Sequence, residues 1–432
     1  MPDTSFALAS ADVRLCALFD RVPAQVRRHR ALIVANGEIA DRKVAVAATD
    51  AGMQRGAIGV EEGHALAQLF ADARGSGTPV VLALDSAGAR VDEDLAALGA
   101  FRRLFGAALD ARGAGVPMLA VLGRSCFGGA SLLACLCGQR SYLPQTLLAA
   151  SGPRVIEAAE GRARFDASDA RLVRAHLGTA ARVAWHEQDS VRADTLEGAR
   201  RAVRDWILQP PAAAPELSGQ QSRLEGRLAA RSAATRDDVS LSSSLLDALL
   251  PPGYVPSFSG RLLQALPDSG AGKPVFVGAL GGSPLDAADS ARLSRCMLAL
   301  RDTRPGCPIV LLLDASAHAA SVLDEDVLLS DYLVHLSLVI GALAGRGHRI
   351  ALWIVGQASG ASYVAFAAPA HSVSATVDAR IEILPPAARA TIIGTRGSRG
   401  TGVDAWLDSR VVDGLLEKRV RLNPEQCGGA ST

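Results

Sequence analysis

The chain has 432 residues, a formal net charge of +1 and 49% hydrophobic residues. This length allows two or three domains with full cores, and the near-neutral charge excludes an electrostatic preference for nucleic acid or an anionic membrane surface. No apolar stretch approaches the roughly 18 residues of a membrane span, and the first residues lack the basic start and apolar core of a signal peptide. We therefore expect a cytoplasmic protein without a membrane segment.

Metal and phosphate motifs do not occur. The seven cysteines form no CxxC pair, which argues against structural zinc and against a disulfide framework. The sequence has no GxxxxGK[ST] loop, HExxH helix or EF-hand pattern, and Gly123 to Phe127 lacks the last glycine of a GxSxG hydrolase elbow. We predict no metal site.

In chain order, the first half alternates short apolar strands with helices. The stretches 43–50, 79–90 and 116–123 are typical of buried strands, and 61–75 and 93–113 have apolar residues at helical spacing. This alternation indicates crossover units around a mostly parallel α/β sheet.

The composition changes around 207–244, where paired prolines, Ala, Ser and Gln replace the hydrophobic periodicity. We predict a linker over 209–240, between domains over 1–208 and 241–432.

The same order of elements recurs after the linker. Four landmarks repeat at nearly constant offset: Asp85 and Asp314 at 229, Gly123 and Gly356 at 233, Gly128 and Gly360 at 232, and Pro153 and Pro385 at 232. Two copies of one domain would explain this spacing. Chance recurrence of common α/β patterns is the alternative.

Each predicted copy has a loop of small residues between a strand and an apolar helix, at 125–130 and at 357–362. Helix N-termini leave backbone N–H groups without intrahelical partners, and glycine lets a ligand approach them. Such donors suit an oxyanion. The alternative is a glycine that serves only backbone geometry or close helix packing.

Other polar residues allow two interpretations each. Asp85 and Asp314 at strand ends are acid–base candidates or turn and capping residues. His64 and His318 are candidates for proton transfer, although neither has an evident partner in the sequence.

A family resemblance follows from the motifs "DSAGAR", "GVPMLAVLGRSCFGGASLLACLC" and "ASGPRVIEAAEG". They resemble the beta subunit of biotin-independent malonate decarboxylase and, more distantly, the carboxyltransferase subunits of acyl-CoA carboxylases. The second half, through "RGHRIALWIVGQASGASYVAFA" and "LPPAARATIIG", is similar to the gamma subunit of that decarboxylase. The resemblance covers roughly 40–205 and 245–415, so the chain looks like a beta–gamma fusion.

The resemblance implies two tandem crotonase-like (ClpP/crotonase) carboxyltransferase domains with β-β-α superhelical units and an active site between an N-type and a C-type domain. The implied reaction is decarboxylation of a malonyl thioester carried on an acyl carrier protein, through an enolate held in oxyanion holes. It further implies no cofactor on this chain, a dephospho-CoA type or phosphopantetheine arm on the carrier, an acyl-carrier transferase subunit as partner, and room for association into a homo-oligomer.

Site residues are carried over by position. Gly128 and Gly129 match the beta-type oxyanion loop, and Gly360 and Ala361 match the gamma-type loop; either loop could take the thioester oxygen or the carboxylate. The other matched positions are Ser125 and Ser359, which would orient these donors or bind the carboxylate, Arg154, for an anionic part of the substrate or a structural ion pair, and Gly56, Ala57, Gly88 and Ala89 for substrate binding.

Two positions depart from the family pattern. Ala361 stands where the gamma-type loop has a second glycine, and Arg55 replaces one of the paired glycines that follow Met in the beta-type loop. For the enolate proton, Glu61, Glu62, His64 and bound water are candidates. Two alternatives stay open: a biotin-dependent acyl-CoA carboxyltransferase, and a specialised or degenerate relative that acts on another malonyl-type thioester in a biosynthetic pathway.

Overall fold

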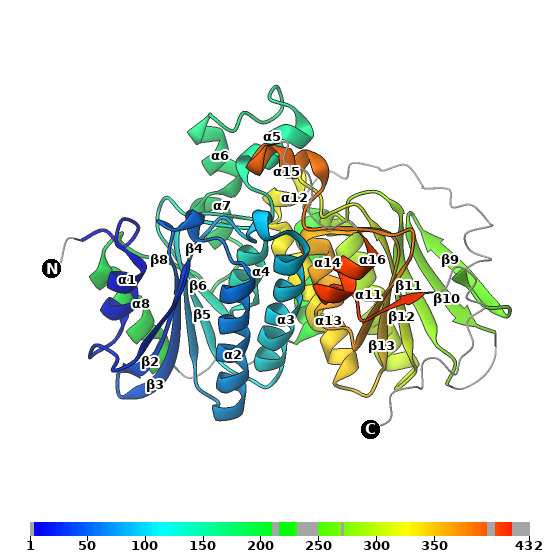
Figure 1. The fold of residues 1–432 in the computed structure, drawn as a ribbon, viewed down its shortest axis with the longest axis horizontal. Coiled ribbons are helices and arrows are strands. Elements are labelled where there is room, and N and C mark those ends of the chain that lie inside the picture. The colour runs from blue at the N-terminus through cyan, green and yellow to red at the C-terminus, as the bar shows by residue number, and fades with distance from the viewer. Residues whose placement is uncertain (1–3, 210–215, 231–248, 269–271, 395–401, 417–432) are drawn as a thin grey trace. The chain divides into compact units, whose positions relative to one another are not determined.

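The computed structural model describes residues 4–209, 216–230, 249–268, 272–394 and 402–416 (Figure 1). The chain forms two compact units. Unit 1 comprises Met1–Pro215, Ala320–Val334 and Pro386–Gly397, and unit 2 comprises Glu216–Ala319, His335–Pro385 and Ser398–Thr432. Unit 1 therefore includes two segments from the second half of the chain.

Unit 1 is built on an eight-stranded sheet in the order β1-β2-β3-β4-β5-β6-β8, with β7 paired to β5. The pairs from β1 to β3 are antiparallel and the others are parallel. All side chains of β4 are buried, as expected for a parallel strand covered on both faces. The bounds are Val26–His29 (β1), Leu32–Ile39 (β2), Arg42–Thr49 (β3), Val80–Ser86 (β4), Met118–Phe127 (β5), Gln139–Tyr142 (β6), Leu147–Ala149 (β7) and Ser190–Val191 (β8).

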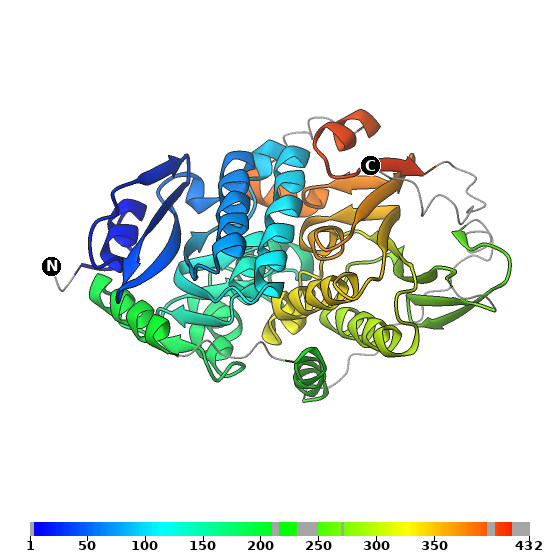
Figure 2. The ribbon, with the colours of Figure 1, turned by 90° about the horizontal axis from the view of Figure 1, so that it is seen from below.

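Helices cover both faces of this sheet. Figures 1 and 2 show α2 (Val60–Ser76) and α3 (Asp94–Gly113) side by side on one face, and α1 (Ala11–Leu18) and α8 (Leu196–Leu208) on the other. The apolar sides of α1 and α8 pack with the sheet into a continuous core. The shorter helices are α4 (Gly129–Leu136), α5 (Pro153–Glu160), α6 (Ala170–Leu177) and α7 (Thr179–Val183), and unit 1 also holds α12 (Val322–Asp326) and α15 (Pro386–Ile393).

Unit 2 repeats the plan with a second eight-stranded sheet, in the order β16-β14-β13-β12-β11-β10-β9, with β15 paired to β13. Here too the first three strands are antiparallel and the rest parallel. The strands are Tyr254–Ser259 (β9), Leu262–Pro267 (β10), Val275–Gly282 (β11), Ile309–Ala315 (β12), Ile350–Ser359 (β13), Ser372–Thr376 (β14), Arg380–Glu382 (β15) and Gly414–Leu416 (β16). The helices are α9 (Leu217–Ala229), α11 (Ala287–Thr303), α14 (Gly360–Ala367) and α16 (Val403–Asp408), while α13 (Leu329–Ala344) begins in unit 1 and ends in unit 2.

Both sheets contain the same bulge. The β4–β5 register passes from Leu84/Leu122 directly to Ser86/Cys126, so three residues, 123–125, face the single residue 85. The β12–β13 register passes from Leu313/Ile354 to Ala315/Ala358 in the same way. Beyond the bulge, β5 pairs with β7 instead of β6, and β13 pairs with β15 instead of β14. The extra residues thus let each strand change its neighbour just before the glycine loop.

The predicted α/β class with mostly parallel sheets is confirmed, and the predicted strands coincide with β3, β4 and β5. The domain boundaries stay predictions. Of the predicted linker, 210–215 and 231–240 lie outside the described residues, while its middle forms α9. This helix lies beside α11 (Figure 2). Gln221 Nε2 of α9 donates to Ala291 O of α11 at 2.8 Å, and the Leu224 side chain of α9 is buried.

Candidate active site

The first glycine loop joins β5 to α4 in unit 1. Gly128 precedes α4 with φ +55, in the left-handed region that favours glycine. The N–H groups of Gly129 and Ala130 occupy the first two positions of the helix. They come before the Ser131 N–H, which donates to Gly128 O at 3.0 Å. The Gly128 N–H, by contrast, donates to Ala150 O at 3.2 Å. The donors that the loop can offer to a ligand are therefore those of Gly129 and Ala130, one residue later than predicted.

Gly129 has a packing reason to be glycine. A Cβ at this position would lie 2.3 Å from the Phe101 ring of α3. The close approach of α3 to the loop therefore excludes any side chain at 129, as in the packing interpretation of the sequence. This packing fixes the start of α4 without occupying the Gly129 N–H.

The predicted substrate-binding segments of unit 1 meet beside this loop. Ile58 N donates to Gly88 O at 2.8 Å, and a short parallel bridge joins Ile58 to Ala89. Gly88 has φ +102, and a Cβ there would lie 2.9 Å from Phe127 O and 3.3 Å from Gly128 Cα. Residues 56–58, 88–89 and 127–128 thus form one continuous backbone surface, although they are far apart in sequence.

Gly56 and Ala57 are buried, whereas Arg55, which departs from the family pattern, is exposed next to them. Gly56 packs on Asp85 O, where a Cβ would approach to 2.1 Å, and Ala57 O accepts a hydrogen bond from Arg90. Arg55 is exposed and has φ +55. An arginine here occupies a backbone conformation that glycine adopts with less strain.

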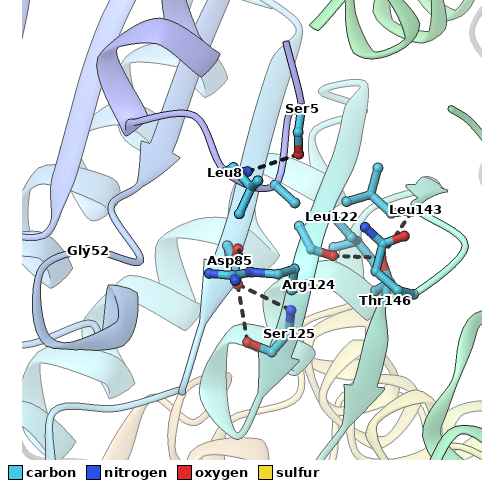
Figure 3. Close-up of polar contacts among 12 residues, drawn as sticks. Ser5, Leu8, Gly52, Asp85, Leu122, Arg124, Ser125, Leu143 and Thr146 are labelled. Atoms are coloured by element: carbon cyan, nitrogen blue, oxygen red, sulfur yellow. Dashed lines mark hydrogen bonds and ion pairs between the residues drawn. The ribbon is translucent and has the colours of Figure 1, made fainter. Parts of the chain in front are cut away.

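Ser125 is directed at Asp85 rather than into the loop. Its N–H and its Oγ both donate to Asp85 Oδ1 at 3.2 Å (Figure 3). Arg14 Nη1 and Arg124 Nε each lie 3.9 Å from Asp85 Oδ2. Of the two roles considered for Ser125, the contacts favour orientation of the loop.

The second glycine loop joins β13 to α14 in unit 2. Gly360 has φ +55, like Gly128, and Ala361 follows it with its side chain buried. Ser359 is also buried, and its Oγ donates to Ser316 O at 2.5 Å, so this hydroxyl anchors the loop to the end of β12.

His318 lies against this second loop. A Cβ on Gly360 would be 3.4 Å from His318 Nδ1 and 3.5 Å from Cε1. A short parallel bridge joins His318 to Leu285, matching the bridge from Ala89 to Ile58 in unit 1. The imidazole is buried to 8% exposure. The structure therefore places an acid–base group at the start of α14 that no residue matches in the first repeat.

The remaining candidates lie in other environments. Arg154 is exposed on α5. Glu61 and His64 form exposed pairs on α2, with His29 at 3.5 Å and with Arg103 at 2.8 Å.

Glu62 is a structural carboxylate. It accepts from Ala31 N at 2.9 Å and Gly59 N at 3.0 Å, and it pairs with Arg90. Burial opposes its ionisation, but these hydrogen bonds and the guanidinium outweigh burial and lower the pKa of Glu62. An ionised, fully bonded carboxylate is a poor proton donor.

A segment of the second half, Ala320–Val334, packs within unit 1 beside the first glycine loop. Ser330 Oγ lies 2.7 Å from Ser131 Oγ, which donates to Gly128 O at 2.6 Å. Glu325 accepts from Ser151 N at 2.8 Å, next to Ala150, the acceptor of Gly128 N–H. No motif in the sequence points to these residues, and the acidic run 324–326 is the one local signal in this segment.

Ion pairs hold this segment to helices and strands of the first half. Asp326 pairs with His176 at 2.6 Å and Asp331 with His186 at 2.7 Å. Arg182, fully buried, donates to Glu325 O at 2.6 Å and lies 3.9 Å from Glu325 Oε2. Burial raises the pKa of Glu325 to about 7, although Arg182 and the Ser151 N–H favour its ionised form.

Two negative findings apply to the described residues alone. Within them, no helix is long and apolar enough to cross a membrane. Across the same ranges, no three His, Cys, Asp or Glu residues gather in an arrangement that could hold a metal ion.

Comparisons with known proteins address the family. Residues 11–215 match the family model "Carboxyl transferase domain". The chain is 30% identical over 128 residues to acetyl-coenzyme A carboxylase carboxyl transferase subunit beta of Xanthobacter autotrophicus, and 25% identical over 165 residues to the methylmalonyl-CoA carboxyltransferase 12S subunit of Propionibacterium freudenreichii. These matches span 29% and 38% of this chain, and 43% and 31% of the relatives, which is less than half of either relative.

A solved structure with a similar fold is that of a Pseudomonas malonate decarboxylase hetero-tetramer in complex with malonate. The similarity covers 54% of this chain and 94% of that chain, at 24% identity and a TM-score of 0.49. Residues 11–215 thus match a carboxyl transferase domain, and the second sheet repeats the strand order of the first, as predicted for two tandem α/β domains of one plan.

Glu325 generates a prediction about stability and pH. The pKa of this carboxyl is about 7 in the fold and 4.5 without it, so the stability it contributes is full below 4.5 and is lost as pH rises through 7. The quantity to compare is the free energy of unfolding of the wild type minus that of Glu325→Gln. We expect this difference to fall by on the order of 3 kcal/mol as the pH rises from below the lower pKa to above the higher one, because one pKa unit corresponds to about 1.4 kcal/mol.

Urea unfolding between pH 5 and 8 measures this difference. A parallel Glu61→Gln series, at an exposed position, corrects for the loss of one formal charge. A difference that is constant with pH would contradict the assignment.

Proposed function

We propose that the protein is a carboxy-lyase that decarboxylates a malonyl thioester. The observation that supports this most is the pair of strand-end loops, each opening a helix with a glycine at φ +55, in a chain with a carboxyltransferase-type domain. Backbone N–H donors at a helix start suit a developing enolate or a carboxylate, because they are already oriented before the reaction.

The reaction breaks the bond between the carboxylate and the α-carbon. Carbon dioxide leaves, and the electron pair passes to the thioester oxygen as an enolate. The N–H groups of Gly129 and Ala130, or of Gly360 and Ala361, stabilise this charge in their respective loops. A proton then adds to the α-carbon and gives the acetyl thioester, so that one proton is consumed for each carbon dioxide released.

We propose that His318 donates the proton that adds to the α-carbon of the enolate. Its imidazole lies beside Gly360, whereas Glu62 is bonded as a structural carboxylate and Glu61 and His64 form exposed pairs on α2. Histidine is suited to this step because its ordinary pKa lies near neutral pH. After the transfer, solvent reprotonates the ring.

The malonyl group is proposed to arrive on an acyl carrier protein, through a thiol arm of the dephospho-CoA or phosphopantetheine type. The exposed Arg154 and Arg55 are available to an anionic part of that arm. An acyl-carrier transferase subunit would load the carrier, and the complex would be hetero-oligomeric. No cofactor on this chain enters the proposed reaction.

A second candidate is a biotin-dependent acyl-CoA carboxyltransferase. The match to a carboxyl transferase domain model favours it, and the same N–H donors would stabilise the same enolate. This reaction moves the carboxyl group between the α-carbon and a biotinylated partner instead of releasing it.

The first prediction from the proposed function is that the full chain releases carbon dioxide from malonyl-charged carrier protein, and that avidin leaves the rate unchanged because no biotin takes part. Labelled carbon dioxide is counted with malonyl carrier and malonyl-CoA as substrates. Avidin-sensitive turnover would support the transferase. A folded protein that leaves both thioesters intact, with the partner subunits present, would contradict both functions.

The second prediction concerns His318. We expect His318→Gln to lower kcat by roughly 100-fold, the usual effect of removing a general acid, with KM changed less than kcat. His64→Gln, on the exposed face of α2, serves as the matched control and should retain wild-type kcat. Equal rates in the two variants would exclude His318 as the donor.

The third prediction concerns Ala361. We expect Ala361→Gly to change kcat by less than about threefold, because the donor in this loop is the backbone N–H, which both residues carry. A rise of more than tenfold would instead support a degenerate relative in which the methyl group obstructs the site. Steady-state kinetics with malonyl carrier distinguish the two.

A further inference from the structure

We propose that Asp85 and Asp314 are positioning residues for the two glycine loops. Each carboxylate holds the bulge through which its strand reaches the loop, and so sets the direction of the loop's N–H groups. This inference rests on the proposed function, because it concerns the donors that the loops offer to substrate.

In unit 1, the Asp85 side chain fills the space opposite the bulge 123–125. Its Oδ1 accepts both hydrogen bonds of Ser125. Gly123 lies directly against the carboxylate: a Cβ at 123 would be 2.6 Å from Asp85 Cβ and 2.7 Å from Cγ. The carboxylate therefore requires glycine at 123 and supplies the acceptor that the bulged backbone would otherwise lack.

Hydrogen bonds and packing also hold the backbone of Asp85, which fixes the position from which its side chain extends. Thr49 Oγ1 accepts from Asp85 N at 2.8 Å and lies 3.1 Å from Asp85 O. Gly56 packs on the same carbonyl, where any Cβ would overlap it. This arrangement connects the predicted substrate-binding segment at 56–57 with the glycine loop through one residue.

Unit 2 shows the same arrangement with different neighbours. Asp314 Oδ1 accepts from Gln357 N at 2.8 Å, and Oδ2 accepts from Gly281 N at 3.2 Å. A Cβ on Gly356 would lie 2.2 Å from Asp314 Oδ1. The aspartate and the bulge recur in both repeats, whereas the glycine against the carboxylate is the first bulged residue in unit 1 and the second in unit 2, and Ser125 is replaced by Gln357. These features recur although the neighbouring side chains differ. We therefore infer that they are required for the conformation of the loop and not for packing of the local core.

The geometry predicts what loss of the carboxylate does. Without it, the Ser125 or Gln357 N–H has no acceptor at the bulge, and the strand relaxes toward ordinary register. Residues 127–129 or 359–361 follow directly and would turn with it. The rest of the substrate does not contact these N–H groups in the proposed reaction. We therefore expect loss of the carboxylate to lower kcat more than it changes KM.

The test compares Asp85→Ala, Asp314→Ala and the conservative Asp85→Asn with the surface control Asp110→Ala, whose side chain is 65% exposed. We expect each alanine variant to lower kcat by roughly 10- to 100-fold, less than or equal to the loss of an oxyanion donor, with KM within about threefold. Asp85→Asn keeps an acceptor for the Ser125 N–H and should recover most of the activity.

Hydrogen exchange followed by mass spectrometry provides a readout independent of activity. We expect faster amide exchange over 123–131 in Asp85→Ala and over 355–362 in Asp314→Ala, with Asp110→Ala unchanged. Far-UV circular dichroism establishes folding, and if Asp85→Ala does not fold, Asp85→Asn and the Asp314 variant decide the question.

A mutant cycle in unit 2 isolates the contact. Gly356→Ala should lower kcat in the wild type, because its Cβ meets the Asp314 carboxylate, and most of that effect should disappear when Asp314 is already alanine. Additive effects, or alanine variants that match Asp110→Ala in both kcat and exchange, would overturn the proposal. If the wild type releases no carbon dioxide, the proposed function fails, while the exchange experiment still decides the role of Asp85 and Asp314.

Discussion

A contact between an aspartate and a glycine on the neighbouring strand recurs at the bulge of both sheets, with the aspartate buried in unit 1 and partly exposed in unit 2. A parallel strand of even register would continue beside the same neighbour. Three residues opposite one break that register, so β5 moves from β6 to β7 and β13 from β14 to β15. The loops with their positive φ values come directly after this displacement.

The two loops share backbone geometry but differ in their side chains. In unit 1, the loop is enclosed by the Phe101 ring and by backbone from residues 56–58 and 88–89. In unit 2, the position of Ala89 is taken by His318, and Gly129 is replaced by Ala361. The two repeats thus share the backbone conformation of the loop, while the side chains around it differ.

Much of this organisation could be predicted from the sequence. The offset between Asp85 and Asp314, and between Gly128 and Gly360, identified the repeat because these positions are tied to one backbone conformation. Contacts between distant residues could not be predicted. The residues around Gly129 in the sequence do not indicate its contact with the Phe101 ring. Likewise, the Gly128 N–H donates to Ala150 O, 22 residues away in the sequence. Helix α9 was interpreted as linker because its composition is polar, whereas one buried face suffices to hold it on α11.

Because Ala320–Val334 belongs to unit 1, the first half of the chain relies on the second half for part of its packing. Arg182 is fully buried, and its counter-charge Glu325 comes from the other half. A chain cut between the repeats would leave the first piece with an uncompensated guanidinium in its interior, which is far costlier than an exposed one. The pieces would then be obligate complements, each marginal alone. A single polypeptide that carries both repeats supplies that complement at a high effective concentration and in equal number.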